Sequence, residues 1–195
     1  MRAKVIIIMA VILTMLSGCN MTQEHVNEST IFVNRDGTIK SIVVEDFPQN
    51  TYDENDLKQM IHDDIWAYNN LHDVTDVRLI SCEVESDTAT VAIQYNSSSD
   101  YAEFNNRDFY FGTVSAALDA GYAKNVTLKN AHGVNTVSGS VINDMATYHM
   151  IVFDEDVKIQ TYASVLYYSE NLNILDDNIV ARAKDARGLS YIIVK

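Results

Sequence analysis

Basic residues, cysteine and proline are all scarce in this chain of 195 residues. Its 14 lysines and arginines are outnumbered by 27 aspartates and glutamates, and the net charge is −13. A negative field of this size repels phosphate backbones and anionic lipid surfaces, so the composition excludes nucleic acid as a partner. Two cysteines cannot form a disulfide framework, so a hydrophobic core has to stabilise the fold.

Sequence signatures of common catalytic sites are missing as well. The five histidines include no pair at helical i, i+4 spacing, which excludes the usual zinc-protease motif. The chain has no Gly-x-Ser-x-Gly elbow, no P-loop and no Gly-x-Gly-x-x-Gly segment. A Ser/His/Asp set brought together from distant segments stays open, because such triads are recognised by geometry.

The long apolar run of this chain is at its N-terminus. Arg2 and Lys4 precede the apolar segment 5–15, which is shorter than the roughly 20 residues that a membrane-spanning helix needs. Small residues then lead to a cysteine in Leu16-Ser17-Gly18-Cys19. This order of basic, apolar and small residues is typical of a secretory signal peptide.

The four residues that end in Cys19 resemble the lipobox of bacterial lipoproteins. The resemblance implies that residues 1–18 are removed as a signal peptide and that the Cys19 thiol carries a diacylglyceryl group. Two acyl chains suffice for stable anchoring in a bilayer, whereas one chain is marginal. We therefore expect attachment to the extracytoplasmic face of the cell membrane. The alternative is an ordinary signal peptide with a coincidental cysteine.

Removal of 18 of the 195 residues leaves 177, a length that suits one domain. Residues 19–29 are expected to form the lipidated cysteine and a flexible polar tether, and residues 30–195 a single domain. Cys82 would then be the one free thiol. We expect it to be buried as a small hydrophobic residue, on the same strand face as Ile80 and Val84.

Apolar spacing predicts one long helix, from about residue 53 to residue 70. Its apolar residues recur at three- and four-residue steps and form one stripe: Leu57, Ile61, Ile65 and Tyr68. Thr51 with Glu54 predicts a capping box at the start of this helix.

Two short helices are also predicted. Asp100 with Glu103 indicates a capping box for the first of them. Thr113 is the expected N-cap of the second, over 114–120, and Gly121 is expected to end it.

The remaining pattern favours strands joined as hairpins. Turns are predicted at 36–37, 85–87 and 154–156, each between two runs with β-type alternation. The third hairpin would join 148–153 to 158–168. Further strands are expected near 178–183 and 191–194, and short strands and loops over 124–144. Strands and helices without βαβ alternation predict an α+β fold with a mainly antiparallel sheet and the long helix packed on it.

Aromatic, glycine and capping positions recur along most of the chain. They are Glu45-Asp46-Phe47, Tyr52-Asp53-Glu54 with Leu57, Tyr68-Asn69, Tyr101 with Phe104-Asn105, Phe111-Gly112-Thr113, Gly121-Tyr122 and Tyr191-Ile192-Ile193. Together they resemble a group of small extracytoplasmic lipoproteins of gut-type Firmicutes, although Val194 stands where that group has a tyrosine. The resemblance implies location and fold, and it assigns no active site.

One side of the long helix is expected to point away from the core. At 100° per residue Trp66 lies opposite Leu57. The polar residues expected on its side are His62, Gln59, Asn69 and Asn70. An exposed aromatic ring beside polar hydrogen-bonding groups is typical of carbohydrate and peptide sites. The alternative is that another segment, such as 124–144, covers the ring.

Two acidic clusters are candidates for a Ca²⁺ site, because hard cations take oxygen ligands. The residues are Asp53, Glu54 and Asp56, and Asp154, Glu155 and Asp156. Helix capping is the alternative explanation for the first cluster, and a hairpin tip for the second. No other cofactor is indicated.

These features favour a non-enzymatic binding or accessory module, anchored in the membrane and facing outward. Its ligand would be an unknown protein, peptide or glycan. The alternative function is a small hydrolase that acts on cell-wall or glycan material.

Overall fold

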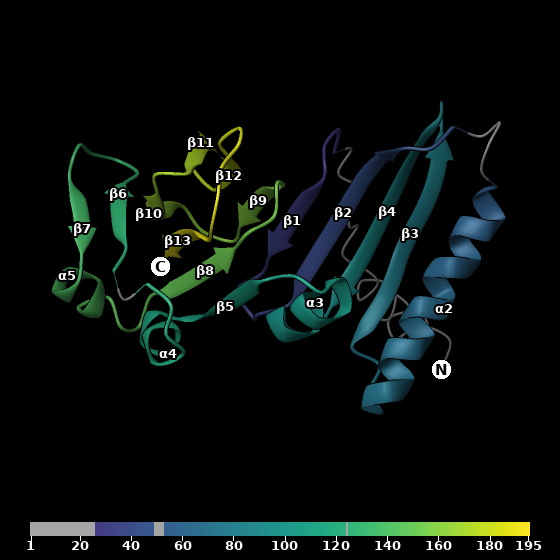
Figure 1. Ribbon diagram of the computed structural model, residues 1–195, viewed down its shortest axis with the longest axis horizontal. Coiled ribbons are helices and arrows are strands. Elements are labelled where there is room, and N and C mark those ends of the chain that lie inside the picture. The colour runs from purple at the N-terminus through teal and green to yellow at the C-terminus, as the bar shows by residue number, and fades with distance from the viewer. Residues whose placement is uncertain (1–25, 49–52, 124) are drawn as a thin grey trace, which may run out of the picture.

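The computed structural model describes residues 26–48, 53–123 and 125–195, which form two β-sheets and four helices (Figure 1). Seven strands belong to sheet A: β1 (Thr30–Val33), β2 (Ile39–Asp46), β3 (Val77–Glu85), β4 (Thr88–Tyr95), β9 (Lys158–Thr161), β11 (Leu172–Asp176) and β12 (Ile179–Arg182). Six belong to sheet B: β5 (Phe109–Thr113), β6 (Thr127–Asn130), β7 (Thr136–Ser138), β8 (His149–Phe153), β10 (Val165–Ser169) and β13 (Ser190–Val194). The helices are α2 (Glu54–His72), α3 (Ser98–Asn105), α4 (Val114–Asp119) and α5 (Ser140–Asn143).

The predicted α+β class with a mainly antiparallel sheet is confirmed. The strand order is β11-β12-β9-β1-β2-β4-β3 in sheet A and β5-β8-β13-β10-β6-β7 in sheet B. Among the described strands, β1 and β9 pair in parallel, with Thr30 opposite Lys158, and the other pairs are antiparallel. Within the described ranges, no helix has both the length and the apolar character needed to cross a membrane.

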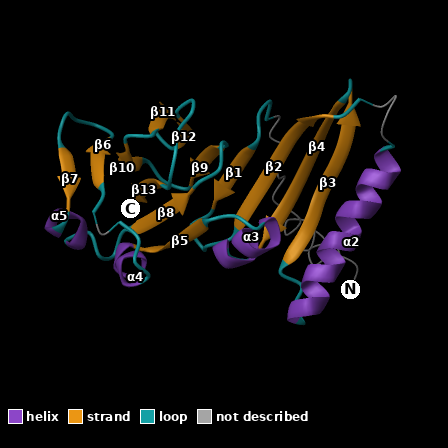
Figure 2. Cartoon of the chain, viewed as in Figure 1, coloured by secondary structure: helices purple, strands orange, loops and turns teal. Residues whose placement is uncertain are grey.

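One face of sheet A, here called the inner face, carries the main core. Sheet B and the helices α2 and α3 lie side by side along sheet A (Figure 2). Ile31 and Ile159 of sheet A share this core with Ile151 and Ile192 of sheet B. Ile61 and Ile65 of α2 and Tyr101 of α3 belong to the same core, next to residues of β3 and β4. The other face of sheet B is covered by α4 and α5, around Met150 and Ile193.

The opposite face of sheet A, here called the outer face, carries a small apolar cluster of Phe32, Ile42 and Ala92. Val26, in the segment that leads into β1, packs against this cluster. The same segment is held by a hydrogen bond from the Val44 amide to Ser29 Oγ (3.0 Å) and by an ion pair between Glu28 and Lys158 (2.9 Å). The chain therefore enters the domain along the outer face of sheet A.

Two of the three predicted hairpins are confirmed. β1 and β2 pair across a turn in which Gly37 has φ 90°, a left-handed conformation that glycine adopts without strain. β3 and β4 pair across Ser86 and Asp87, with φ 51° and 63°. Positive φ at both central residues is what a tight turn between twisted strands requires.

The third predicted hairpin is wrong. β8 lies in sheet B between β5 and β13, whereas β9 lies in sheet A between β1 and β12, so the loop 154–157 crosses from one sheet to the other. The predicted strand 158–168 is in fact two strands, one in each sheet. Residues 150–153 are all buried, as in a central strand covered on both faces, while β9 alternates between buried and half-buried positions. The two strands therefore face different surroundings despite the acidic turn between them.

The expected burial of Cys82 is confirmed, because 8% of the residue is exposed and it packs in the main core. Burial raises the pKa of its thiol, which keeps the thiol protonated. The prediction that Ile80 lies on the same strand face as Cys82, however, is wrong. An irregularity between Leu79 and Ser81 shifts the register of β3, so Ile80 leaves the face of Cys82 and is 43% exposed.

Helix ends follow capping chemistry, with two corrections. The N-cap of α2 is Asp53, which accepts hydrogen bonds from the amides of Asn55 and Asp56; Thr51 lies outside the described residues. The N-cap of α3 is Ser97, whose hydroxyl accepts from the Asp100 amide, so the box begins three residues earlier than predicted. Thr113 caps α4 as expected.

The end of α4 and the segment after it were partly predicted. Gly121 follows α4 with φ 96°, as expected for a glycine just past a helix. The segment 124–144 contains the short strands β6 and β7, as predicted, and also the single turn α5, which was not predicted.

Candidate functional site

The outward side of α2 presents the predicted aromatic residue to solvent. Trp66 is 68% exposed, and Gln59, His62 and Asn70 on the same side are exposed as well. These four residues are called the helix face below. The segment 124–144 does not cover Trp66, because β6, β7 and α5 lie at the opposite end of the molecule (Figure 1).

Contacts on the other side of α2 fix this orientation. Ile61 and Ile65 are buried against sheet A. The expectation that Asn69 shares the outward side is wrong, because its side-chain amide donates to the Val77 carbonyl (2.8 Å) and accepts from the Val77 amide (3.1 Å). These bonds tie the helix to the start of β3. Tyr68 donates to an Asp100 carboxylate oxygen (3.0 Å) near the start of α3. Rotation of α2 would break these bonds, so the helix face stays outward.

Within the helix face, the Gln59 side chain already makes a hydrogen bond. Its amide nitrogen donates to Asp63 Oδ1 at 2.8 Å, one turn along the helix. His62 and Trp66 are also one turn apart, so the imidazole and the indole lie next to each other along the helix surface. The arrangement offers a flat apolar ring with hydrogen-bonding groups around it.

The structure adds a groove that sequence reasoning did not predict. It has a volume of about 500 Å³ and lies between β2, α3 and the crossing loop 154–157. It is called the Glu155 groove below. Its polar lining residues are Ser29, Thr30, Ser41, Glu45, Tyr101, Asn105, Arg107, Asp154, Glu155 and Asp156. None of the histidines in the described ranges lines it.

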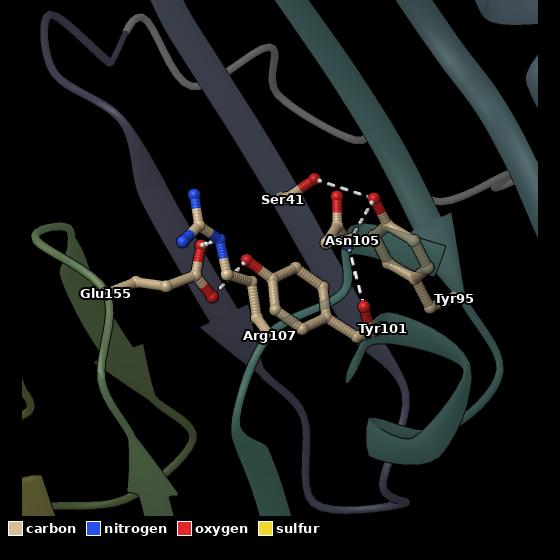
Figure 3. Close-up of polar contacts among 6 residues, drawn as sticks. All are labelled: Ser41, Tyr95, Tyr101, Asn105, Arg107 and Glu155. Atoms are coloured by element: carbon tan, nitrogen blue, oxygen red, sulfur yellow. Dashed lines mark hydrogen bonds and ion pairs between the residues drawn. The ribbon is translucent and has the colours of Figure 1, made fainter. Parts of the chain in front are cut away.

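Glu155 lines this groove, and Figure 3 shows its polar contacts. Its side chain is 14% exposed and turns from the crossing loop toward α3. The Tyr101 hydroxyl donates to Glu155 Oε1 at 2.9 Å, and Arg107 Nε lies 3.7 Å from Oε2. The carboxylate therefore joins the loop between the two sheets to both ends of the segment 101–107.

A second set of polar contacts lies beside the first (Figure 3). Asn105 donates through its side-chain amide to the Tyr95 hydroxyl (3.2 Å) and to the Tyr101 carbonyl (2.8 Å). The Tyr95 hydroxyl also lies 3.4 Å from Ser41 Oγ. These groups are bonded to one another, so they rigidify the wall of the groove.

Burial raises the pKa of both Glu155 and Tyr101. It raises the pKa of Glu155, and the hydrogen bond from Tyr101 and the charge of Arg107 oppose this shift. Burial and the nearby Glu155 carboxylate raise the pKa of Tyr101, so its hydroxyl stays protonated and acts as the donor. A buried carboxyl with a raised pKa is the type of group that can act as a general acid.

Three of the six acidic residues considered for Ca²⁺ have other partners. Asp53 caps α2, and Glu54 pairs with Lys58 at 2.5 Å. Asp56 is exposed, Asp154 and Asp156 are exposed, and Glu155 is bound by Tyr101 and Arg107. In the described ranges, no three His, Cys, Asp or Glu side chains come together in a group that could hold a metal ion.

Comparison of the chain with protein-family models, curated proteins and solved structures finds no match. Sequence reasoning selected Glu155 for a different role, and it missed Tyr101, Asn105 and Arg107 as partners. Tyr101 and Glu155 are 54 residues apart, and no local pattern signals that they meet.

We predict that the fluorescence of Trp66, the sole tryptophan, is red-shifted and quenched by acrylamide, because the ring is in water. Trp66→Ala should change the free energy of unfolding by less than about 0.5 kcal/mol. Ile65→Ala, one residue earlier and buried, is the control and should cost about 2–5 kcal/mol. Denaturant titration measures both values. Blue-shifted emission with a strongly destabilised Trp66→Ala variant would contradict an exposed helix face.

We predict that Glu155→Gln removes a pH dependence of stability. Since the pKa of Glu155 is raised on folding, the folded state binds this proton more tightly, and ionisation destabilises it as the pH rises above about 4.3. Relative to wild type, the Gln variant should gain stability between pH 4 and pH 7. Asp154→Asn, at an exposed neighbouring position, should follow wild type. Parallel curves for Glu155→Gln and wild type would show that the Arg107 ion pair offsets the effect of burial.

Proposed function

We propose that this protein is a lipid-anchored, extracytoplasmic binding module. The lipobox-like segment that ends in Cys19 supports the anchor, and the acidic composition suits a protein that works beside a membrane without adhering to it. Residues before Val26 lie outside the described ranges, so the support for the anchor comes from the sequence.

The position of Val26 supports an outward orientation of the helix face. Val26 packs on the outer face of sheet A, and α2 packs on the inner face. Seven peptide units join Cys19 to Val26, so an extended chain spans at most about 25 Å between them. An anchored Cys19 would thus hold the outer face near the bilayer and leave Trp66 pointing away from it.

The observation that carries the binding function is the 68% exposure of Trp66. Large aromatic side chains are usually covered in a folded chain, and an exposed one beside His62 and amide groups suits a sugar ring or a peptide. The ring would supply a flat apolar surface, and the neighbouring groups would supply hydrogen bonds that orient the ligand.

A small glycan-directed hydrolase is the second candidate function. It is supported by Glu155, a partly buried carboxyl with a raised pKa in a groove that also contains Glu45, Asp154 and Asp156. Glycosidases use one protonated and one ionised carboxyl group on either side of the scissile bond. Against this function, Glu155 is already bound to Tyr101 and Arg107, which hold it in a structural contact.

The anchor is tested by Cys19→Ser. We predict that cells grown with a fatty-acid probe label the wild-type protein and leave the variant unlabelled, since serine cannot form the thioether to the lipid. Cys82→Ser is the matched control and should be labelled like wild type, because this thiol is buried in the core. Label on the Cys19→Ser protein would contradict the lipobox assignment.

The binding function is tested by screening the purified protein on glycan and peptide arrays. We predict that Trp66→Ala loses binding by at least about tenfold, the loss expected when an aromatic contact is removed. Leu71→Ala removes another exposed apolar residue from α2, outside the helix face, and should leave binding unchanged. Release of reducing ends from a bound glycan, abolished by Glu155→Gln, would support the hydrolase instead.

A further inference from the structure

The ring of Trp66 is exposed and also lacks a partner within the domain. Among the described residues, none of the contacts between two rings or between a cation and a ring involves this indole. The rings of Phe32, Tyr148 and Tyr162, by contrast, each have the charged group of a lysine or an arginine within 5.8 Å of their centres. Trp66 is therefore an aromatic surface that a cation from outside the chain can cover.

Asp63 supplies a negative charge beside this ring. It lies three residues before Trp66 on α2, and residues at this spacing are neighbours on a helix surface. Helical side chains lean toward the N-terminal end of the helix, which brings the indole toward the turn that carries Asp63. Asp63 is exposed, and it takes part in none of the ion pairs among the described residues. An exposed aromatic ring and a carboxylate without a cationic partner thus lie next to each other.

Gln59 holds the Asp63 carboxylate in position. Its side-chain amide donates to Asp63 Oδ1 at 2.8 Å, one turn along the helix. A carboxylate has two oxygens with about four acceptor sites, so this one bond orients the group and leaves acceptors for a ligand. Gln59 is therefore a positioning residue for Asp63.

The side chains of α2 that form ion pairs lie elsewhere on the helix. Lys58 pairs with Glu54 at 2.5 Å, and His72 pairs with Glu103 of α3 at 3.3 Å. At 100° per residue, these two cationic groups are about 140° and 180° around the helix from Asp63. The charge of Asp63 is therefore left for a cation that comes from another molecule.

We propose that Trp66 and Asp63 bind an arginine side chain of a peptide, with the guanidinium group stacked on the indole and paired with the carboxylate. The guanidinium group suits both contacts at once, because it is planar, always charged and carries five N–H donors. Charge complementarity favours this ligand over a neutral sugar, which would cover the ring and leave Asp63 without a counter-charge. The inference rests on the binding function proposed above and names the ligand class of that site.

The test uses the full chain in a non-ionic detergent and three glycine-rich pentapeptides, blocked at both ends, that differ at the central residue. That residue is arginine, citrulline, which has nearly the same shape without the charge, or lysine, which has the charge without the planar group. Trp66 is the sole tryptophan, so its fluorescence reports binding at this site directly.

We predict that the arginine peptide binds at least about fivefold more tightly than the citrulline peptide, because citrulline has no charge to pair with Asp63. It should bind about two- to threefold more tightly than the lysine peptide, because an ammonium group cannot stack as a plane on the indole. Added salt should weaken the binding of the arginine peptide.

Variants assign the binding to this pair of residues. Asp63→Asn should weaken the binding of the arginine peptide by about three- to fivefold, since asparagine keeps the acceptor for Gln59 and loses the charge. Asp64→Asn is the matched control, because Asp64 is also exposed and lies on another side of the helix, so Kd should change by less than about 1.5-fold. Trp66→Ala, followed through the NMR signals of the peptide, should remove the binding.

The outcomes separate this inference from the binding function on which it rests. Equal binding of the citrulline peptide, or an equal effect of Asp63→Asn and Asp64→Asn, would overturn the pairing of arginine with Asp63. A neutral glycan that binds the wild type and is lost in Trp66→Ala, without binding of the arginine peptide, would overturn the inference and leave the binding function standing. Unchanged binding of every array ligand by Trp66→Ala would contradict both.

Discussion

Sheet B and the helices α2 and α3 all pack on the inner face of sheet A, and the rest of the structure depends on this constraint. Sheet B takes one part of that face, and α2 and α3 take the other. The loop 154–157 has to cross from one sheet to the other beside α3, and this crossing brings Glu155 to Tyr101 and Arg107. The same arrangement sets α2 at one end of the molecule with Trp66 outward, and leaves the outer face of sheet A without a helix among the described residues.

Local interactions were predictable from the sequence, and contacts between distant segments were not. The turns at Gly37 and at Ser86 depend on backbone conformations that neighbouring residues favour, and both hairpins form as expected. The outward side of Trp66 follows from the 100° step of the helix, whereas its exposure also depends on the absence of another segment over the ring among the described residues. The acidic turn at 154–156 has the same local signature as a hairpin, but the burial of β8 on both faces depends on partners elsewhere in the chain. The Glu155 contacts have the same origin, since they join the crossing loop to the segment 101–107, which the sequence does not mark as its neighbour.

The parallel pairing of β1 with β9 also has a consequence for how the chain folds. Thr30 is opposite Lys158, so the first strand of sheet A completes its pairing only after most of the chain is available. Contacts between positions so far apart form slowly, because the intervening chain must be ordered before they are gained. Until then, one edge of the β1–β2 hairpin exposes unpaired amides and carbonyls, which are sites for association with other chains. Sheet A can therefore complete its folding only when the C-terminal half of the chain is present. A chain that ends before β9 would keep an unpaired edge on β1.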